Sequence, residues 1–386
     1  MKRIYLDYSA TTPLDPEALR AMQPYFSGYL GNPSSVHAFG REARLALEEA
    51  RETLARSVGA RPDEIFFTSG GTESDNHAVK GTAHRAVGKR GAHVLVSAVE
   101  HHAVLHPALS LRRAGFEVEL LPVDSNGRVD PEDLRRRVRP ETILVSVMHA
   151  NNEVGTIQPI AELAAITRPV GIPLHTDAVQ SFGKIPVNVA HLGVDLMSLS
   201  GHKIYGPRGI GVLFVRKGTP LEPLLEGGSQ ERNLRAGTEN VALAVGFAKA
   251  AELAVMRRDA DAQRLSALKK LLRGKLENIS DGILWNGHGG ETLPSVLSLS
   301  FDSSAGVVDG EALIMGMDLE GVAVTSGSAC TSGTLEPSHV LLAMGRDEAT
   351  ARATIRFSMG RATTEEDLEA AANAVKVVLA RIRKAR

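Results

Sequence analysis

Short apolar runs alternate with segments of helical character along the first half of the chain. The runs lie at residues 65–68, 93–97, 142–148, 172–176, 194–199 and 210–215. This alternation is typical of an α/β domain built around a mainly parallel sheet. Ligands bind at the carboxyl ends of the strands in such sheets, so the residues that follow each run are the first candidates for function.

The hydrophobic pattern changes near residues 256–261, where the chain becomes strongly charged. A long helix is predicted to follow, because apolar side chains recur there on one helical stripe. The stripe consists of Leu265, Leu268, Leu272, Leu276 and Ile279. We therefore expect a large domain over residues 14–257 and a small domain formed by residues 1–13 and 258–386.

The last third of the chain mixes predicted strands and helices, which indicates that the small domain is of the α+β type. The strands are expected at 296–301, 322–325 and 354–358, and the helices at 310–317 and 336–344. A closing helix is expected to begin at Thr363, because Glu366 three positions later gives a capping-box signature.

The composition narrows the class of function. The chain has 44 Lys and Arg residues against 45 Asp and Glu residues, for a formal net charge of -1. Such a balance gives no field to attract nucleic acid or an anionic membrane, so we expect a small-molecule substrate and no direct nucleic-acid binding. The N-terminal segment lacks the apolar run of a signal peptide, and no later run approaches the roughly 18 residues that span a bilayer. A cytoplasmic protein is expected.

Cys330 is the only cysteine of the chain and lies in the stretch TSGSACTSGT, residues 325–334. A single cysteine cannot form an intrachain disulfide or supply the usual ligand set of an iron–sulfur cluster. Its neighbours favour turns and exposed loops, which indicates a presented, reactive thiol. The alternative is a small apolar residue of a protein core, which is the commoner use of a free cysteine.

Two glycines and a threonine, Gly70, Gly71 and Thr72, follow the run at 65–68 and precede a predicted helix. Glycines let backbone amides approach an anion, and a helix N-terminus favours negative charge. A phosphate group is the expected ligand, because the pattern matches neither GxGxxG nor GxxxxGK(S/T). A glycine turn with Thr72 as helix N-cap is the alternative.

Asp177 and Lys203 follow two further apolar runs. A buried carboxylate at Asp177 requires several hydrogen bonds or a positive partner, such as a pyridinium nitrogen. Partial desolvation at Lys203 would lower the pKa of its amine and make it a nucleophile toward an aldehyde. Taken singly, Asp177 as a helix N-cap and Lys203 as a solvated surface charge are the ordinary alternatives.

His101 and His102 follow the run at 93–97. Adjacent side chains point in different directions, so one imidazole can face a pocket while the other does not. A zinc site needs further ligands, and the chain has neither HExxH nor CxxC, so no metal site is predicted. A phosphate cradle, an acidic partner, an imidazole and a lysine at successive strand ends together meet the requirements of pyridoxal phosphate.

Ten blocks, spread over essentially the whole chain, resemble the cysteine desulfurases of the class V aminotransferase group, in particular the nitrogenase-type and housekeeping iron–sulfur assembly enzymes. The blocks are YLDYSATTP (5–13), GNPSSVH (31–37), FTSGGTESDN (67–76), EHHAV (100–104), NNEVGTIQP (151–159), HTDAVQSFGK (175–184), SGHKIYGPRGIG (200–211), GGSQERNLRAGTEN (227–240), SGSACTS (326–332) and IRFSMGR (355–361). The resemblance implies the fold type I of pyridoxal-phosphate enzymes: a large domain with a mainly parallel seven-stranded sheet, and a small domain that carries a catalytic cysteine loop at about 325–335.

The resemblance also implies a role for each site residue. Lys203 would hold the cofactor covalently and move the proton of the substrate α-carbon, with His101 stacked on the cofactor ring, and Cys330 would take up the sulfur. The implied cofactor-binding residues are Gly71, Thr72, His101, Asn152, Asp177, Gln180, Ser200, His202, Lys203 and Thr238. The implied substrate-binding residues are Asn32, Asn152 and Arg356.

The implied reaction converts L-cysteine to L-alanine and leaves a persulfide on Cys330, which passes its sulfur to an acceptor protein. Candidate acceptors are an iron–sulfur scaffold, a nitrogen-fixation scaffold and enzymes that thiolate tRNA or DNA. Thr238 resembles a residue that binds the phosphate in the neighbouring subunit, which implies a homodimer. A selenocysteine lyase, a small-amino-acid aminotransferase and a non-catalytic binding platform are the alternatives, and neither related enzyme needs Cys330.

Overall fold

The computed structural model describes residues 3–28, 31–86, 92–287, 289–327 and 336–384 of the 386. Its strands are β1 (Ile4–Tyr5), β2 (Ile65–Thr68), β3 (His93–Ser97), β4 (Glu117–Leu121), β5 (Thr142–Ser146), β6 (Leu174–Asp177), β7 (Leu196–Ser200), β8 (Gly211–Val215), β9 (Ile283–Asn286), β10 (Val296–Phe301), β11 (Val322–Ala323) and β12 (Thr354–Ser358). Its α-helices are α1 (Pro16–Met22), α2 (Pro24–Ser27), α3 (Ala38–Val58), α4 (Gly71–Asn76), α5 (Thr82–Ala86), α6 (His102–Ser110), α7 (Pro131–Arg137), α8 (Ile160–Thr167), α9 (Val189–Leu192), α10 (Val241–Leu276), α11 (Gly310–Leu319), α12 (His339–Ala343), α13 (Glu348–Arg352) and α14 (Glu365–Lys384).

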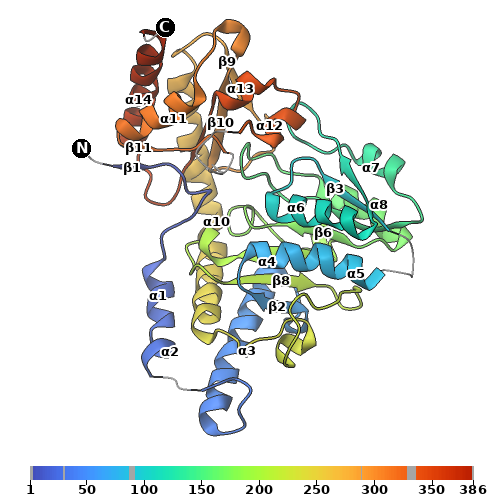
Figure 1. Cartoon of the computed structure of the whole chain (residues 1–386). Helices are drawn as coiled ribbons and strands as arrows, with labels where there is room; N and C mark the ends of the chain where they lie inside the picture. The colour runs from blue at the N-terminus through green and yellow to red at the C-terminus, as the bar shows by residue number, and fades with distance from the viewer. Residues whose placement is uncertain (1–2, 29–30, 87–91, 288, 328–335, 385–386) are drawn as a thin grey trace.

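Seven strands form the sheet of the large domain, in the order β2-β8-β7-β6-β5-β3-β4. Only β8 runs antiparallel to its neighbours, so the prediction of a mainly parallel seven-stranded sheet is confirmed. Every residue of β3, β5, β7 and β8 is buried. Figure 1 shows α4, α5 and α6 in front of these strands. Burial on both faces explains why the strands are continuous apolar runs rather than alternating ones.

The small domain is built on an antiparallel sheet in the order β12-β10-β9. The N-terminal strand β1 pairs in parallel with β11, so the first residues of the chain pack with its last third. Helices α11 and α14 contribute to the apolar core of this domain, which contains Leu6, Leu313, Phe357 and Val375. The domain boundaries at residues 14 and 258 stay a prediction.

The closing helix α14 begins at Glu365, two residues later than predicted. The reciprocal cap is formed by Thr364 and Asp367: the Thr364 amide donates to Asp367 Oδ2 (3.0 Å), and the Asp367 amide donates to Thr364 Oγ1 (3.2 Å). The predicted capping residue, Thr363, instead accepts a hydrogen bond from the Gly360 amide. The expected capping pair of Thr363 with Glu366 is therefore wrong, because two adjacent threonines precede a run of acidic residues.

The helix α10 runs without a break through the charged stretch at 256–261 and has 36 residues. Its first half belongs to the large-domain core through residues such as Phe247 and Ala251, and its second half belongs to the small-domain core through Leu268 and Leu272. The charges in between are accommodated at the helix surface, where Arg257 pairs with Asp15 and Glu17. The expected long helix therefore starts at Val241, well before the charged stretch.

Candidate active site

One cavity gathers eight of the predicted site residues, at the carboxyl ends of β2, β3, β5, β6 and β7. They are Gly71, Thr72, His101, Asn152, Asp177, Gln180, Ser200 and Lys203. Asp75, Ala103, Met148 and Val179 complete the lining. The cavity lies where binding is expected in a parallel sheet, since the polar residues after successive strands meet at one edge.

Lys203 lies in a 3₁₀ turn (Gly201–Lys203) directly after β7. Its ammonium donates to the carbonyl oxygens of Ser9 (2.7 Å) and Ala10 (2.8 Å), so the N-terminal segment fixes the amine in place. Burial lowers the pKa of Lys203 to about 8, and the nearby Arg356 guanidinium adds to this effect. A substantial fraction of the amine is therefore neutral and nucleophilic near pH 7 to 8.

Asp177 is the last residue of β6 and is 5% exposed. Its Oδ1 accepts a hydrogen bond from the Val179 amide (2.8 Å), and no Lys, Arg or His of the described ranges forms an ion pair with it. Burial raises the pKa of Asp177 to about 6, although the Val179 amide and the charge of Lys203 oppose the shift. The carboxylate thus lacks a cationic partner at a place where one would strongly stabilise it.

His101 is the N-cap of α6, and its Nδ1 accepts a hydrogen bond from the Ala103 amide (3.1 Å). Burial lowers the pKa of His101 to about 4, so the ring is neutral at physiological pH, with its proton on Nε2. The adjacent His102 stacks on His106 (4.5 Å between ring centroids) and on His339 (4.7 Å). Among the described residues no cluster of His, Cys, Asp or Glu could hold a metal ion.

The turn from β2 into α4 forms the end of the cavity that is suited to a phosphate group. A Cβ atom at Gly71 would approach Val179 Cγ2 to 2.9 Å, so this position has no room for a side chain. Gly70, with φ at 155°, precedes the helix in a conformation that glycine adopts readily. The Ser200 side chain lies on the facing side of the turn, 3.6 Å from the same Cβ position. Helix-start amides and hydroxyl groups are the donors that phosphate prefers.

Arg356, on β12, brings the small domain against the cavity wall and is 5% exposed. Its Nη1 donates to the Asn152 carbonyl oxygen (2.8 Å) and its Nη2 pairs with Asp7 Oδ1 (2.7 Å). Its Nε is buried and has no hydrogen-bond partner. Two of the five N–H donors of the guanidinium are thus engaged, which holds the group in place, and a planar guanidinium of this kind can bind a carboxylate through two hydrogen bonds.

Arg356 contacts the backbone of Asn152 but is not itself among the residues that line this cavity, and three further predicted site residues also lie elsewhere. His202 is turned toward the N-terminal segment, with Nδ1 3.1 Å from Thr11 Oγ1. Asn32 is exposed and its Oδ1 accepts from the Ser34 amide. Thr238 lines a separate pocket with Phe26 and Glu239. Cys330 lies outside the described residues.

Three functional neighbours were missed from the sequence: Asp7, Ser9 and Lys184. Asp7 pairs with Arg356, the Ser9 carbonyl accepts from Lys203, and Lys184 donates to Gln180. All three lie in blocks already quoted, YLDYSATTP and HTDAVQSFGK. Ser9 and Asp7 lie 194 and 349 residues from their partners, so no local pattern indicates these contacts. Lys184 is only four residues from Gln180, but the sequence does not show that its side chain is buried.

The cavity fits pyridoxal phosphate by its donor set. The Lys203 amine matches the aldehyde of the cofactor, and the Asp177 carboxylate, which lacks an ion-pair partner in the described part of the chain, matches the pyridinium nitrogen. Gly71 has no side chain, so the backbone amides at the start of α4 are open to a phosphate group. A neutral His101 ring in the same lining is suited to stacking on the pyridine.

Comparisons with known proteins identify the family of the chain. Residues 4–371 match the aminotransferase class-V family. A protein named cysteine desulfurase IscS, from Dictyoglomus turgidum, is 51% identical over 384 residues, which cover 99% of this chain and 96% of that protein. The solved structure of a NifS-like protein has a TM-score of 0.90 at 39% identity and covers 98% of this chain and 99% of its own. A structure described as SspA in complex with cysteine has a TM-score of 0.80 at 35% identity, covering 92% and 98% of the two chains. The chain therefore belongs to the class V aminotransferase family, and within it to the cysteine desulfurases.

Proposed function

We propose that the chain converts L-cysteine to L-alanine and transfers the sulfur to Cys330 as a persulfide. The observation that carries this function is the meeting of a nucleophilic Lys203 amine, a buried Asp177 carboxylate and the Arg356 guanidinium around one cavity. Relatives named cysteine desulfurase, and the related SspA structure with cysteine, support L-cysteine as the substrate.

Pyridoxal phosphate, when bound, acts as an electron sink that makes the bonds around the substrate α-carbon labile. Asp177 would keep the ring nitrogen protonated, Gln180 would bond the ring hydroxyl, and Gly71, Thr72 and Ser200 would hold the phosphate with His202. Lys203 would hold the cofactor and then carry the proton that leaves the α-carbon. Its pKa of about 8 suits both tasks, because an amine in that range gives and takes protons readily near neutral pH.

Arg356 would bind the substrate carboxylate, with Asn32 and Asn152 as further contacts. Its guanidinium already has Asp7 on one side and the Asn152 carbonyl on the other, so the substrate would add to a fixed group instead of ordering a free one. Fixing the carboxylate places the substrate α-carbon and its sulfur-bearing β-carbon relative to Lys203.

The sulfur transfer is a displacement at sulfur. The Cys330 thiolate attacks the sulfur of the substrate, a sulfur–sulfur bond forms, and the carbon–sulfur bond breaks. The electron pair of the broken bond stays with carbon, which takes up a proton and leaves as L-alanine. Cys330 then carries a persulfide whose outer sulfur passes to an acceptor protein, for which we propose an iron–sulfur scaffold or a thiolation enzyme.

We also propose a homodimer in which Thr238 serves the neighbouring subunit. Within one chain Thr238 lines a pocket apart from the cofactor cavity, beside the exposed Phe26 (64%). Both carboxylate oxygens of the adjacent Glu239 are buried and lack a hydrogen-bond partner. A second subunit would cover the aromatic side chain and bring Thr238 to a phosphate. Within the described ranges no helix is long and apolar enough to cross a membrane, and we propose a cytoplasmic location.

The experiment that tests the proposed function loads the purified protein with pyridoxal phosphate and supplies L-cysteine under reductant. With the reductant, equal amounts of alanine and sulfide are expected. In a parallel sample without reductant, alkylation and mass measurement should find one added sulfur on Cys330. Cys330→Ala should stay yellow and form no protein persulfide, and Lys203→Ala should lose the covalent cofactor linkage. A colourless wild-type protein, or a fully active Cys330→Ala variant, would contradict the proposal.

A further inference from the structure

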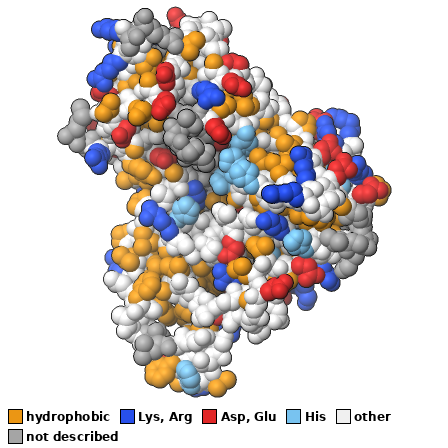
Figure 2. Space-filling view, viewed as in Figure 1, with side chains coloured by type: hydrophobic (Ala, Val, Ile, Leu, Met, Phe, Trp, Pro, Cys, Tyr) orange, Lys and Arg blue, Asp and Glu red, His pale blue; other side chains and the backbone are white. Residues whose placement is uncertain are grey.

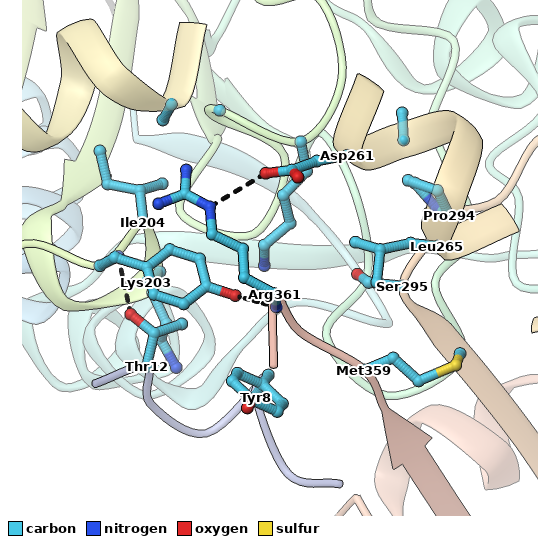
Figure 3. A pocket seen from close by; sticks show the side chains of 15 residues that line it. Tyr8, Thr12, Lys203, Ile204, Asp261, Leu265, Pro294, Ser295, Met359 and Arg361 are labelled. Carbon is cyan, nitrogen blue, oxygen red and sulfur yellow. Dashed lines mark hydrogen bonds and ion pairs between the residues drawn. The ribbon is translucent and has the colours of Figure 1, made fainter. Parts of the chain in front are cut away.

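A second cavity shares Lys203 with the cofactor cavity (Figure 3). Lys184 also lines this second cavity. Asp261 is the acidic residue of this lining, and Arg361 Nε already pairs with it at 3.0 Å. The backbone amide of Arg361 also donates to the Tyr205 hydroxyl oxygen (2.8 Å), as the dashed lines of Figure 3 show. Asp261 is therefore ion-paired with Arg361 and does not neutralise the charge of Lys184.

Lys184 lies four residues after Gln180, in the turn that follows β6. Its ammonium donates to Gln180 Oε1 at 2.9 Å, and the ion pairs of the described residues include none with Lys184. Burial, together with the charges of Lys203 and Arg356, lowers the pKa of Lys184 to about 7. A buried amine without an acidic partner costs folding free energy, so its contact with Gln180 calls for a functional explanation.

The contact fixes which end of the Gln180 amide faces which neighbour. A lysine ammonium has three donors and no acceptor, so the oxygen of Gln180 must face Lys184. The amide nitrogen is then turned away from Lys184 and donates to the Ser9 carbonyl oxygen at 2.9 Å. The same carbonyl accepts from Lys203 at 2.7 Å. A single hydrogen-bonded series thus joins Lys184, Gln180, Ser9 and Lys203.

We propose that Lys184 is a positioning residue that keeps Gln180 a hydrogen-bond donor toward the cofactor cavity. Gln180 lines that cavity, and an amide flipped by 180° would present its oxygen instead of its nitrogen. The Lys184 ammonium has no acceptor and therefore fixes this orientation, and a neutral amine can still donate to the same oxygen. The inference rests on the proposed function, in which Gln180 donates to the ring oxygen of pyridoxal phosphate.

A double-mutant cycle on the holoenzyme tests the proposal. The variants are Lys184→Met, Gln180→Ala and the pair, with Lys376→Met as a matched control on the exposed face of α14. Two quantities are measured without turnover: the rate of cofactor loss into a pyridoxal-phosphate scavenger, and the absorption of the bound cofactor as a function of pH. Lys184→Met should speed cofactor loss about tenfold, as for one lost hydrogen bond, and should displace the absorption titration.

The decisive comparison is made in the Gln180→Ala background, where Lys184→Met should change neither quantity. Lys184→Arg, which also presents only donors, should stay close to wild type, and Lys376→Met should be unchanged. Lys184→Gln can present either an oxygen or a nitrogen, so it should show an intermediate effect and replaces Lys184→Met if that variant does not fold.

Two outcomes would overturn the role of Lys184. One is a Lys184→Met or Lys184→Gln variant that retains the cofactor and its absorption titration as wild type does. The other is an equal effect of the substitution with and without Gln180, which would mean that Lys184 does not act through that amide. A wild-type protein that binds no pyridoxal phosphate would instead refute the proposed function, so the two failures are distinguishable.

Discussion

At the scale of single residues, burial shifts Asp177 and Lys203 in opposite directions toward their neutral forms. The pKa of the carboxyl group rises to about 6 and that of the amine falls to about 8. A ligand that supplies a cation would stabilise the Asp177 carboxylate. A ligand that supplies a carbonyl carbon would react with the neutral Lys203 amine. Cofactor binding thereby offsets the free energy that burial of the two groups costs.

Replacing Asp177 with asparagine removes a charge but keeps the shape of the side chain. We expect cofactor binding and alanine formation to fall roughly 10- to 100-fold, because a hydrogen bond to a charged group contributes about 1.5–3 kcal/mol. Equilibrium dialysis of pyridoxal phosphate and an alanine assay measure the two effects. Asp63→Asn, at an exposed carboxylate, serves as control, and equal results for the two variants would contradict the role of Asp177.

The pKa of Lys203 predicts how fast the apoprotein captures its cofactor at different pH values. Only the neutral amine attacks an aldehyde, and its fraction rises with pH up to a pKa of about 8. The second-order rate of capture should therefore rise about tenfold per pH unit below pH 8 and level off above it. Stopped-flow absorbance measures this rate, and a profile that keeps rising to pH 10 would show an amine that is not buried.

The strand ends could be predicted from the sequence because apolar runs buried on both faces are long and sharply bounded. β2, β3, β10 and β12 begin and end where predicted. The edge strand β4 was missed, since its burial alternates and its charged Glu117 and Glu119 break the apolar run. Lys184 was missed for a related reason: a lysine after a glycine is typical of a surface turn, and only tertiary packing buries it.

At the scale of elements, Glu153 joins two segments that are distant in sequence. Its Oε2 accepts a hydrogen bond from the Ser338 hydroxyl, just before α12, and a Cβ at Gly327 would lie 3.0 Å from the same oxygen. Glu153 is 5% exposed, and burial raises the pKa of its carboxyl group. The chain before residue 328 and the chain after residue 335 therefore meet at one buried side chain beside Asn152.

Glu153→Ala should lower the free energy of unfolding by about 1–3 kcal/mol, because Ser338 loses its buried acceptor. Glu153→Gln keeps an acceptor oxygen in the same place and should lose less than half as much. Urea unfolding followed by circular dichroism measures both. If the alanine and glutamine variants are equally destabilised, the hydrogen bond is not what stabilises this junction.

At the scale of the whole molecule, buried neutral histidines couple stability to pH. Burial lowers the pKa of His149 to about 4 and that of His175 to about 3. In the unfolded chain a histidine takes up its proton near pH 6.5. The unfolded state thus binds more protons between pH 6.5 and 4, so the stability due to these residues is present above pH 6.5 and is lost as the pH falls.

His149→Gln isolates this effect, because a glutamine at that position does not titrate. Between pH 7 and pH 5 the wild-type protein should lose roughly 2 kcal/mol more of its free energy of unfolding than the variant. Urea titrations at the two pH values measure the difference. His191→Gln, at an exposed position, should show the same pH dependence as wild type. Equal slopes for His149→Gln and wild type would refute a neutral buried His149.

The helix α10 has a mechanical consequence for unfolding. At 1.5 Å per residue its 36 residues extend about 54 Å, and both cores pack on this one rod. If either core unfolds, the corresponding half of α10 loses its tertiary contacts. The other core is then destabilised, because it packs against the same helix. Cooperativity should therefore extend across the interface, so that calorimetry of the monomeric unit records one transition instead of two. Arg356 and Lys203 adjoin residues of different cores, Phe357 and Ile204, so their relative placement is then as rigid as the helix that links the cores.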